Sequence, residues 1–333
     1  MDFRNYEGVL GMRVLGLFVF LFALNGPASA AIFDYDIYLP QTVKAYIRDM
    51  QSGSRAEGSP QCEPMYRPML KDGILDIRYA FGYFDDSQGK QLRWNGINYG
   101  ISPSMDIVAF ESLRQVLASR CTYRNMRLCE FQASGDQRMG KMIFEKEMEI
   151  QGEEVLVRIT MTQGSVSESY SQNIGQQANK QRFFIDQSEE NYFGGLEEAD
   201  VVFYNGHSRD GGGPDFRPPI LNKYNKTDYK NYYQVEKPGI RKTLEAISRN
   251  PNPGFVVGLF SCYSRSHFYK DFMRQNPEQR LILSADTIDY FDSMIASIGY
   301  MEAILRGQCG QDMANTAKKG SKIKRGYQQY LMN

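Results

Sequence analysis

The second half of the chain alternates short apolar runs with helical stretches, and this order limits the folds that it can adopt. The apolar runs cover 201–205, 254–260 and 281–286, and helical patterns cover 238–249, 266–275 and 292–307. Short, continuously apolar runs are typical of strands buried on both faces, as in a parallel sheet between two helical layers. The sequence therefore predicts an α/β fold with a mostly parallel sheet and helices on both faces.

The preceding residues show a different pattern. Two alternating segments, 142–150 and 154–162, flank Gln151-Gly152 and predict a hairpin, and 182–200 is predicted to be largely helical. Further upstream, the sequence predicts a helix over 42–50, a strand over 74–84 and a helix over 106–120 with Ser104 as its N-cap. We therefore divide the chain into an N-terminal α+β region over 31–140, with no assigned role, and an α/β domain over 141–333.

The first 30 residues have the features of a secretory signal peptide. Met12-Arg13 precedes the apolar stretch VLGLFVFLFAL at 14–24, and Ala28-Ser29-Ala30 has the small-residue pattern of a cleavage site. Asp2 and Glu7 do not suit the start of a signal peptide, which makes Met12 a candidate start. Because the apolar stretch is too short to span a bilayer comfortably, we expect an exported mature protein without a membrane span, periplasmic or extracellular.

The five cysteines fit an exported protein, because disulfides persist outside the cytosol. Because the number of cysteines is odd, at least one must remain a free thiol or form an intermolecular disulfide. Cys121 and Cys129 are close enough in sequence to pair, but Cys62 competes and the connectivity with Cys309 stays open. No C-x-x-C pair occurs and the two histidines are far apart, so we predict neither a metal nor a cofactor. The 39 acidic and 39 basic residues balance, which gives no sign of nucleic-acid binding.

Two reactive side chains follow two of the predicted strands. His207 comes directly after VVFYNG, and Cys262 comes directly after VVGLFS. Catalytic groups in open parallel sheets gather at the carboxyl ends of the strands, so neighbouring strands would present the imidazole and the thiol at one edge. A nearby base or cation is what turns a thiol into a nucleophilic thiolate. The pattern predicts a Cys-His dyad with a nucleophilic thiolate.

An apolar strand ending in His, followed by one ending in Cys, resembles the caspase-like cysteine peptidases, which include caspases, legumains, gingipains and clostripain. Cys262 lies 55 positions after His207, similar to the spacing of about 50 in caspases. The resemblance covers roughly 150–310. It implies a caspase-like fold for 141–333, a thiol endopeptidase activity, and an oxyanion site formed by the backbone N–H groups of Ser208 and Cys262.

The chain departs from that family at two positions. Ser208 follows His207 where the family usually has Gly, and Ser261 precedes Cys262 where it often has Ala. The caspase signature around the cysteine is absent, so cleavage after aspartate is not implied. No third residue that would extend the dyad to a triad is assigned, although Asp210 lies near His207 in the sequence. The acidic candidates for a pocket that takes a basic side chain are Asp215, Asp286 and Asp289.

Two other functions fit the same residues. GHSRD is similar to a G-x-S-x-G nucleophile elbow, with Ser208 as the nucleophile and His267 as the base of a serine hydrolase. However, Asp210 occupies the position of the second glycine, and His267 falls on a predicted helix, where it is expected to pack or lie at the surface. The remaining alternative is a catalytically inactive caspase-like binding module.

Overall fold

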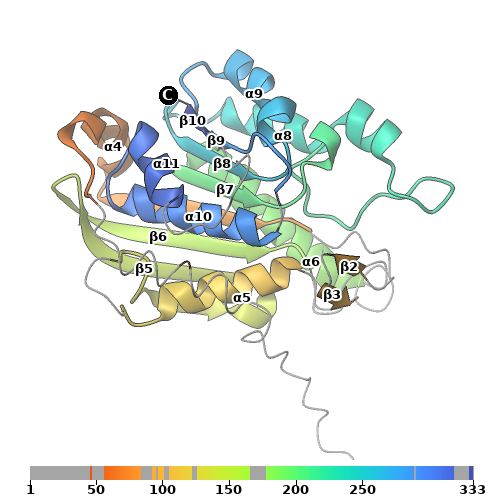
Figure 1. Cartoon of the computed structure of the whole chain (residues 1–333), viewed down its shortest axis with the longest axis horizontal. Coiled ribbons are helices and arrows are strands. Elements are labelled where there is room, and N and C mark those ends of the chain that lie inside the picture. The colour runs from red at the N-terminus through yellow and green to blue at the C-terminus, as the bar shows by residue number, and fades with distance from the viewer. Residues whose placement is uncertain are drawn as a thin grey trace, which may run out of the picture.

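In the computed structural model, eight of the described strands form one sheet, with the order β10-β9-β8-β7-β1-β6-β5-β4 (Figure 1). The structure describes residues 46, 56–83, 92–94, 97–100, 105–121, 126–165, 178–288, 290–318 and 330–332. The parallel strands are β1 (Ile74–Phe81), β6 (Glu153–Gln163), β7 (Val201–Asn205), β8 (Val256–Phe260) and β9 (Arg280–Leu283). Counted along the chain, these five strands have the spatial order 2-1-3-4-5, which is a doubly wound arrangement.

Antiparallel strands extend the sheet at both edges. The predicted hairpin is present: β5 (Lys141–Ile150) pairs with β6, and β4 (Gln132–Asp136) pairs with β5. At the other edge β10 (Tyr330–Met332) pairs with β9. A separate pair of strands consists of β2 (Leu92–Trp94) and β3 (Ile97–Gly100). The prediction of a mostly parallel α/β sheet is confirmed.

Helices cover both faces of the sheet because side chains of the central strands alternate between two apolar clusters. In β7, Val201 and Phe203 belong to one cluster, whereas Val202 and Tyr204 belong to the other. The first cluster packs against α4 (Glu63–Leu70), α5 (Met105–Ala118), α10 (Tyr290–Leu305) and α11 (Gly310–Lys318). The second packs against α7 (Gly195–Glu198), α8 (Pro238–Ile247) and α9 (Ser264–Gln275), and α6 (Ala178–Glu189) leads into α7 through a π-helical segment. Figure 1 shows α8 and α9 on the opposite side of the sheet from α10 and α11.

The boundary predicted at residue 140 does not separate two units in the described part of the chain. β1 is a central strand, paired with β6 on one side and with β7 on the other. Residues of α4 and α5 share one apolar cluster with α10 and α11. The sequence of 74–84 indicates a strand but does not show which strands it pairs with. Its partners, β6 and β7, both come after residue 140, so the sequence pattern alone suggested a separate N-terminal region. The signal-peptide prediction for 1–30, Ser104 and most of 42–50 lie outside the described residues.

Two disulfides are present, Cys62–Cys309 and Cys121–Cys129. The pair suggested by short spacing is therefore confirmed, and Cys62 pairs instead with Cys309, directly before α11. Cys262 takes part in neither disulfide. Such bonds are compatible with a protein that folds in an oxidising compartment. Among the described helices, none combines the length and the apolar character needed to cross a bilayer.

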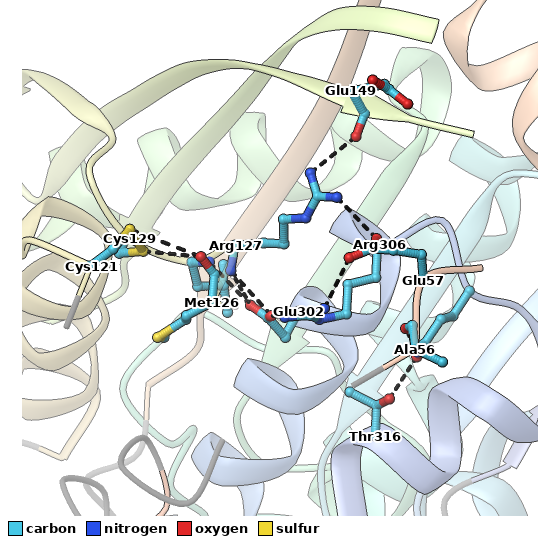
Figure 2. A network of polar contacts seen from close by, with 12 residues as sticks. Ala56, Glu57, Cys121, Met126, Arg127, Cys129, Glu149, Glu302, Arg306 and Thr316 are labelled. Carbon is cyan, nitrogen blue, oxygen red and sulfur yellow. Dashed lines mark hydrogen bonds and ion pairs between the residues drawn. A yellow bond between two sulfur atoms is a disulfide. The ribbon is translucent and has the colours of Figure 1, made fainter. Parts of the chain in front are cut away.

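A buried ion-pair network secures the end of α10 at the amino edge of the sheet (Figure 2). Glu302 is 1% exposed, and its carboxylate accepts hydrogen bonds from the backbone N–H groups of Arg127 and Leu128 and from the Arg306 guanidinium. Glu57 joins from the surface by pairing with both Arg127 and Arg306. The network therefore ties the segment beside the Cys121–Cys129 disulfide to α10 and to the chain ahead of α4.

Asp200, just before β7, gives the fold a pH-dependent stability. Its carboxylate accepts a hydrogen bond of 3.0 Å from the Asp76 N–H. Burial, with smaller contributions from the carboxylates of Asp76 and Asp72, raises the pKa of Asp200 from 3.8 to about 7, and that hydrogen bond and Lys71 oppose the change. Because the folded state then holds a proton that the unfolded state releases, the free energy of unfolding falls as the pH rises from about 4 to about 7.

We expect Asp200→Asn to remove this fall and to stabilise the protein at pH 8 by up to about 4 kcal/mol relative to the native chain. The amide keeps an oxygen that can accept the Asp76 N–H. Urea unfolding at pH 4, 6 and 8 measures the effect, and Asp72→Asn is the control, which should keep most of the slope because the Asp72 carboxylate is a minor cause of the raised Asp200 pKa. Equal slopes in the native chain and in Asp200→Asn would contradict the assignment.

Candidate active site

The strands that carry His207 and Cys262 are neighbours in the sheet. β7 and β8 are parallel and in register from Val201 opposite Val256 to Asn205 opposite Phe260, and every residue of both strands is buried. His207 follows Asn205 by two positions, and Cys262 follows Phe260 by two positions. The structure thus brings both residues to the carboxyl edge of the sheet, and both are partly exposed there.

A buried polar network connects the last residues of β7 and β8 through a side chain of α10. The Ser293 hydroxyl, near the start of α10, donates to Asn205 Oδ1 and lies 3.1 Å from the Phe260 carbonyl oxygen. Asn205 Nδ2 in turn donates to the Tyr79 hydroxyl at 3.1 Å. All four residues are almost completely buried, where a fully hydrogen-bonded network fixes one arrangement. The strand ends that precede His207 and Cys262 are therefore joined by buried hydrogen bonds.

The loop after β7 folds back on itself and holds His207 at its start. The Tyr204 hydroxyl donates to the His207 carbonyl oxygen at 3.0 Å and accepts the Asp215 N–H at 3.1 Å. The N–H groups of Gly211 and Gly213 both donate to the Ser208 carbonyl oxygen at 3.0 Å. Gly211 has a φ of +89°, which favours glycine at this position of the turn. The glycines of this stretch thus serve the turn.

Asp215, one of the acidic residues considered for a pocket that takes a basic side chain, forms an ion pair with Arg209 inside the loop. Asp215 Oδ2 lies 3.5 Å from Arg209 Nε and accepts a hydrogen bond of 2.8 Å from the Tyr233 hydroxyl. Arg209 is fully buried and also donates to the Tyr83 carbonyl oxygen. Burial raises the pKa of Asp215, and the charge of Arg209 opposes that shift. Asp215 therefore stabilises the loop from within, whereas Asp286 is exposed and Asp289 lies outside the described residues.

The loop after β8 holds Cys262 against the segment that follows β9. Tyr263 has a φ of +51°, and its N–H donates to the Asp286 carbonyl oxygen at 2.9 Å. Cys262 Sγ lies 3.4 Å from the Ile288 carbonyl oxygen and 3.5 Å from the Ile288 N–H nitrogen. The carbonyl oxygen accepts from the thiol, whereas the N–H group can donate to the sulfur in either protonation state. These contacts fix the position of the Cys262 side chain at the carboxyl edge of the sheet.

Ser208 connects the two loops. Its hydroxyl donates to the Cys262 carbonyl oxygen and lies 2.9 Å from Ser261 Oγ. Ser208 is only 4% exposed, and its φ of −70° and ψ of −18° are ordinary helical values. The nucleophile of a serine hydrolase instead sits on a strained turn with an exposed hydroxyl. These observations weigh against Ser208 as a nucleophile.

His267, the other histidine, packs against the same loop from α9. Its Nδ1 lies 3.2 Å from the position that a Cβ on Gly211 would occupy. Burial lowers the pKa of His267, Lys237 lowers it further, and Asp210 opposes both. Asp210 is exposed and accepts a hydrogen bond from the Gln234 side chain. The expectation that His267 is a packing residue agrees with this contact.

No family model, curated protein or solved structure matches the chain. Among the residues that the structure describes, no cluster of His, Cys, Asp or Glu is arranged to hold a metal ion. A cavity of about 490 Å³ lies at the opposite edge of the sheet, where its lining charges include the ion-paired Asp76, Arg78 and Glu198.

Sequence reasoning missed the residues that position this site. Ser293 and Tyr79 belong to none of the motifs discussed above, and Arg209 occupies an unspecified position of GHSRD. Ser293 is one of several polar residues in a largely apolar helix, so nothing in the sequence singles it out. Ser208 was noticed for its hydroxyl, but its partner across the loops could not be inferred from spacing.

Proposed function

We propose that the protein is an exported cysteine endopeptidase of the caspase-like type, with Cys262 as nucleophile and His207 as acid and base. The observation that carries the proposal is the position of these residues directly after two adjacent parallel strands. Two further facts support it. The other four cysteines form disulfides, and the doubly wound strand order is one in which ligands bind at the carboxyl edge.

The chemistry follows from the residue types. His207 accepts the thiol proton, and Cys262 Sγ attacks the substrate carbonyl carbon to give a tetrahedral oxyanion. The backbone N–H groups of Ser208 and Cys262 stabilise this oxyanion. When the C–N bond breaks, His207 returns the proton to the leaving amine and a thioester remains on Cys262. A water molecule, deprotonated by His207, then hydrolyses the thioester, which releases the acid and restores the thiol.

The proposal includes export of the protein from the cytosol. The signal-peptide pattern at 1–30 directs the chain out of the cytosol, and the two disulfides are compatible with that destination. The polypeptide substrate would then be an extracytoplasmic one.

Alkylation of Cys262 tests the dyad without any knowledge of the substrate. Under non-reducing conditions iodoacetamide should label Cys262 alone among the five cysteines, because the other four are disulfide-bonded. An imidazolium beside the thiol lowers its pKa, so we expect His207→Ala to slow labelling at pH 6 by roughly tenfold or more. Intact-mass measurements across pH 5 to 9 follow the reaction.

His267→Ala is the matched control, since it removes the only other imidazole of the chain. Its labelling profile should match that of the native protein. If His207→Ala and His267→Ala both react as the native chain does, no imidazole activates Cys262 and the dyad is wrong.

A further inference from the structure

The Ser208 side chain occupies a place that the proposed chemistry does not use. It lies next to His207, and its hydroxyl is bonded to the backbone of Cys262 and to the Ser261 hydroxyl. Building on the proposed function, we infer that Ser208 is a positioning residue, which sets the Cys262 main chain in a fixed relation to the His207 loop.

Both ends of Ser208 are held, so its hydroxyl has a defined position. The Ser208 carbonyl oxygen accepts hydrogen bonds from Gly211 and Gly213, each at 3.0 Å. The side chain is buried, and so is that of Ser261. Because this hydroxyl donates to the Cys262 carbonyl oxygen, it fixes the Cys262 peptide group relative to the loop that carries His207.

The peptide group between Cys262 and Tyr263 is bonded on both sides. Ser208 holds the Cys262 carbonyl oxygen, and the Asp286 carbonyl oxygen accepts the Tyr263 N–H. Because Tyr263 is in the left-handed region, this peptide can relax into a more common conformation once one of these bonds is lost. Loss of the Ser208 hydroxyl would therefore turn the Cys262 backbone and move the thiol relative to His207.

The buried position makes this contact hard to replace. A hydroxyl removed from a buried site leaves the Cys262 carbonyl oxygen without that donor. Alanine removes only the oxygen, and glycine also removes Cβ, so the two variants separate the role of the hydroxyl from that of packing.

The experiment compares Ser208→Ala and Ser208→Gly with Ser188→Ala. Ser188 is also fully buried, and its hydroxyl also donates to a main-chain carbonyl oxygen, that of Gln163 at 2.8 Å. For each protein we would measure kcat and KM on a cleaved peptide, the pH profile of Cys262 alkylation by iodoacetamide, and the thermal unfolding midpoint.

We expect both Ser208 variants to lower kcat by roughly ten- to a hundredfold with KM changed less than about twofold, and to shift the alkylation profile. Ser188→Ala should lower the unfolding midpoint while it leaves kcat and the alkylation profile unchanged. If Ser208→Ala lowers only the unfolding midpoint, as Ser188→Ala does, Ser208 has a purely structural role and the inference is overturned.

The alkylation profile separates this inference from the proposed function. If no peptide is cleaved, or if Cys262→Ala keeps its activity, the peptidase proposal fails. A shifted profile in the Ser208 variants would still support positioning of the Cys262 thiol in that case. An unshifted profile, in a protein whose labelling depends on His207, overturns the positioning role alone.

Discussion

Cys262→Ala should abolish peptide cleavage, with a loss of at least about 10³-fold in kcat/KM relative to the native protein. The thiol forms the covalent bond in the proposed mechanism, so its removal leaves that step without its nucleophile. Incubation of the purified protein with a mixed peptide library, followed by mass spectrometry of the products, measures cleavage before the substrate is known.

Cys262→Ser is the second variant for this experiment, because it keeps the shape of the side chain with a much weaker nucleophile. It should fold as the native chain does and cleave at a rate close to that of Cys262→Ala. Full activity in Cys262→Ala would end the cysteine-peptidase proposal. Loss of activity in Ser208→Ala together with an active Cys262→Ala would instead identify a serine hydrolase. Cleavage by none of the proteins, with specific binding of a partner protein, would identify an inactive binding module.

Glu302→Ala should lower the free energy of unfolding by about 3–5 kcal/mol, the cost of breaking a buried ion pair by removal of one partner. Arg306 is 3% exposed and would keep its charge without the carboxylate that faces it. The N–H groups of Arg127 and Leu128 would lose their acceptor as well. Urea unfolding followed by circular dichroism measures the loss.

Glu57→Gln is the control for this network. Glu57 pairs with the same Arg306, but more than half of its side chain is exposed, and exposed pairs contribute about 1 kcal/mol or less. Because the network is at the amino edge, neither substitution should alter Cys262 alkylation in the folded protein. An effect of Glu302→Ala as small as that of Glu57→Gln would show that the buried pair contributes little.

The positions of His207 and Cys262 could be predicted because the relevant signals are local. Each residue follows an apolar run, and the rule that parallel strands end at one edge supplies their proximity once the two strands are neighbours. The same reasoning gave the helices that became α8, α9 and α10 within a few residues of their observed bounds.

The central position of β1 could not be predicted in this way. Its sequence shows a strand, but pairing with β6 and β7 depends on residues about 80 to 120 positions later. The Cys62–Cys309 disulfide has a separation of 247 residues, and spacing favours nearer cysteines. Ser208 is the sharpest example, because the sequence shows a serine where the related pattern has glycine, and only the fold shows which group its hydroxyl meets.

The Cys62–Cys309 disulfide closes residues 62–309 into a covalent ring that contains both proposed active-site residues. Cleavage of one peptide bond near Tyr224, which lies between β7 and β8 and is 72% exposed, would open this ring without releasing a fragment. His207 and Cys262 would then belong to two polypeptides that remain one molecule until the disulfide is reduced. The bond would thus keep the two chains of a nicked protein together even when the protein unfolds.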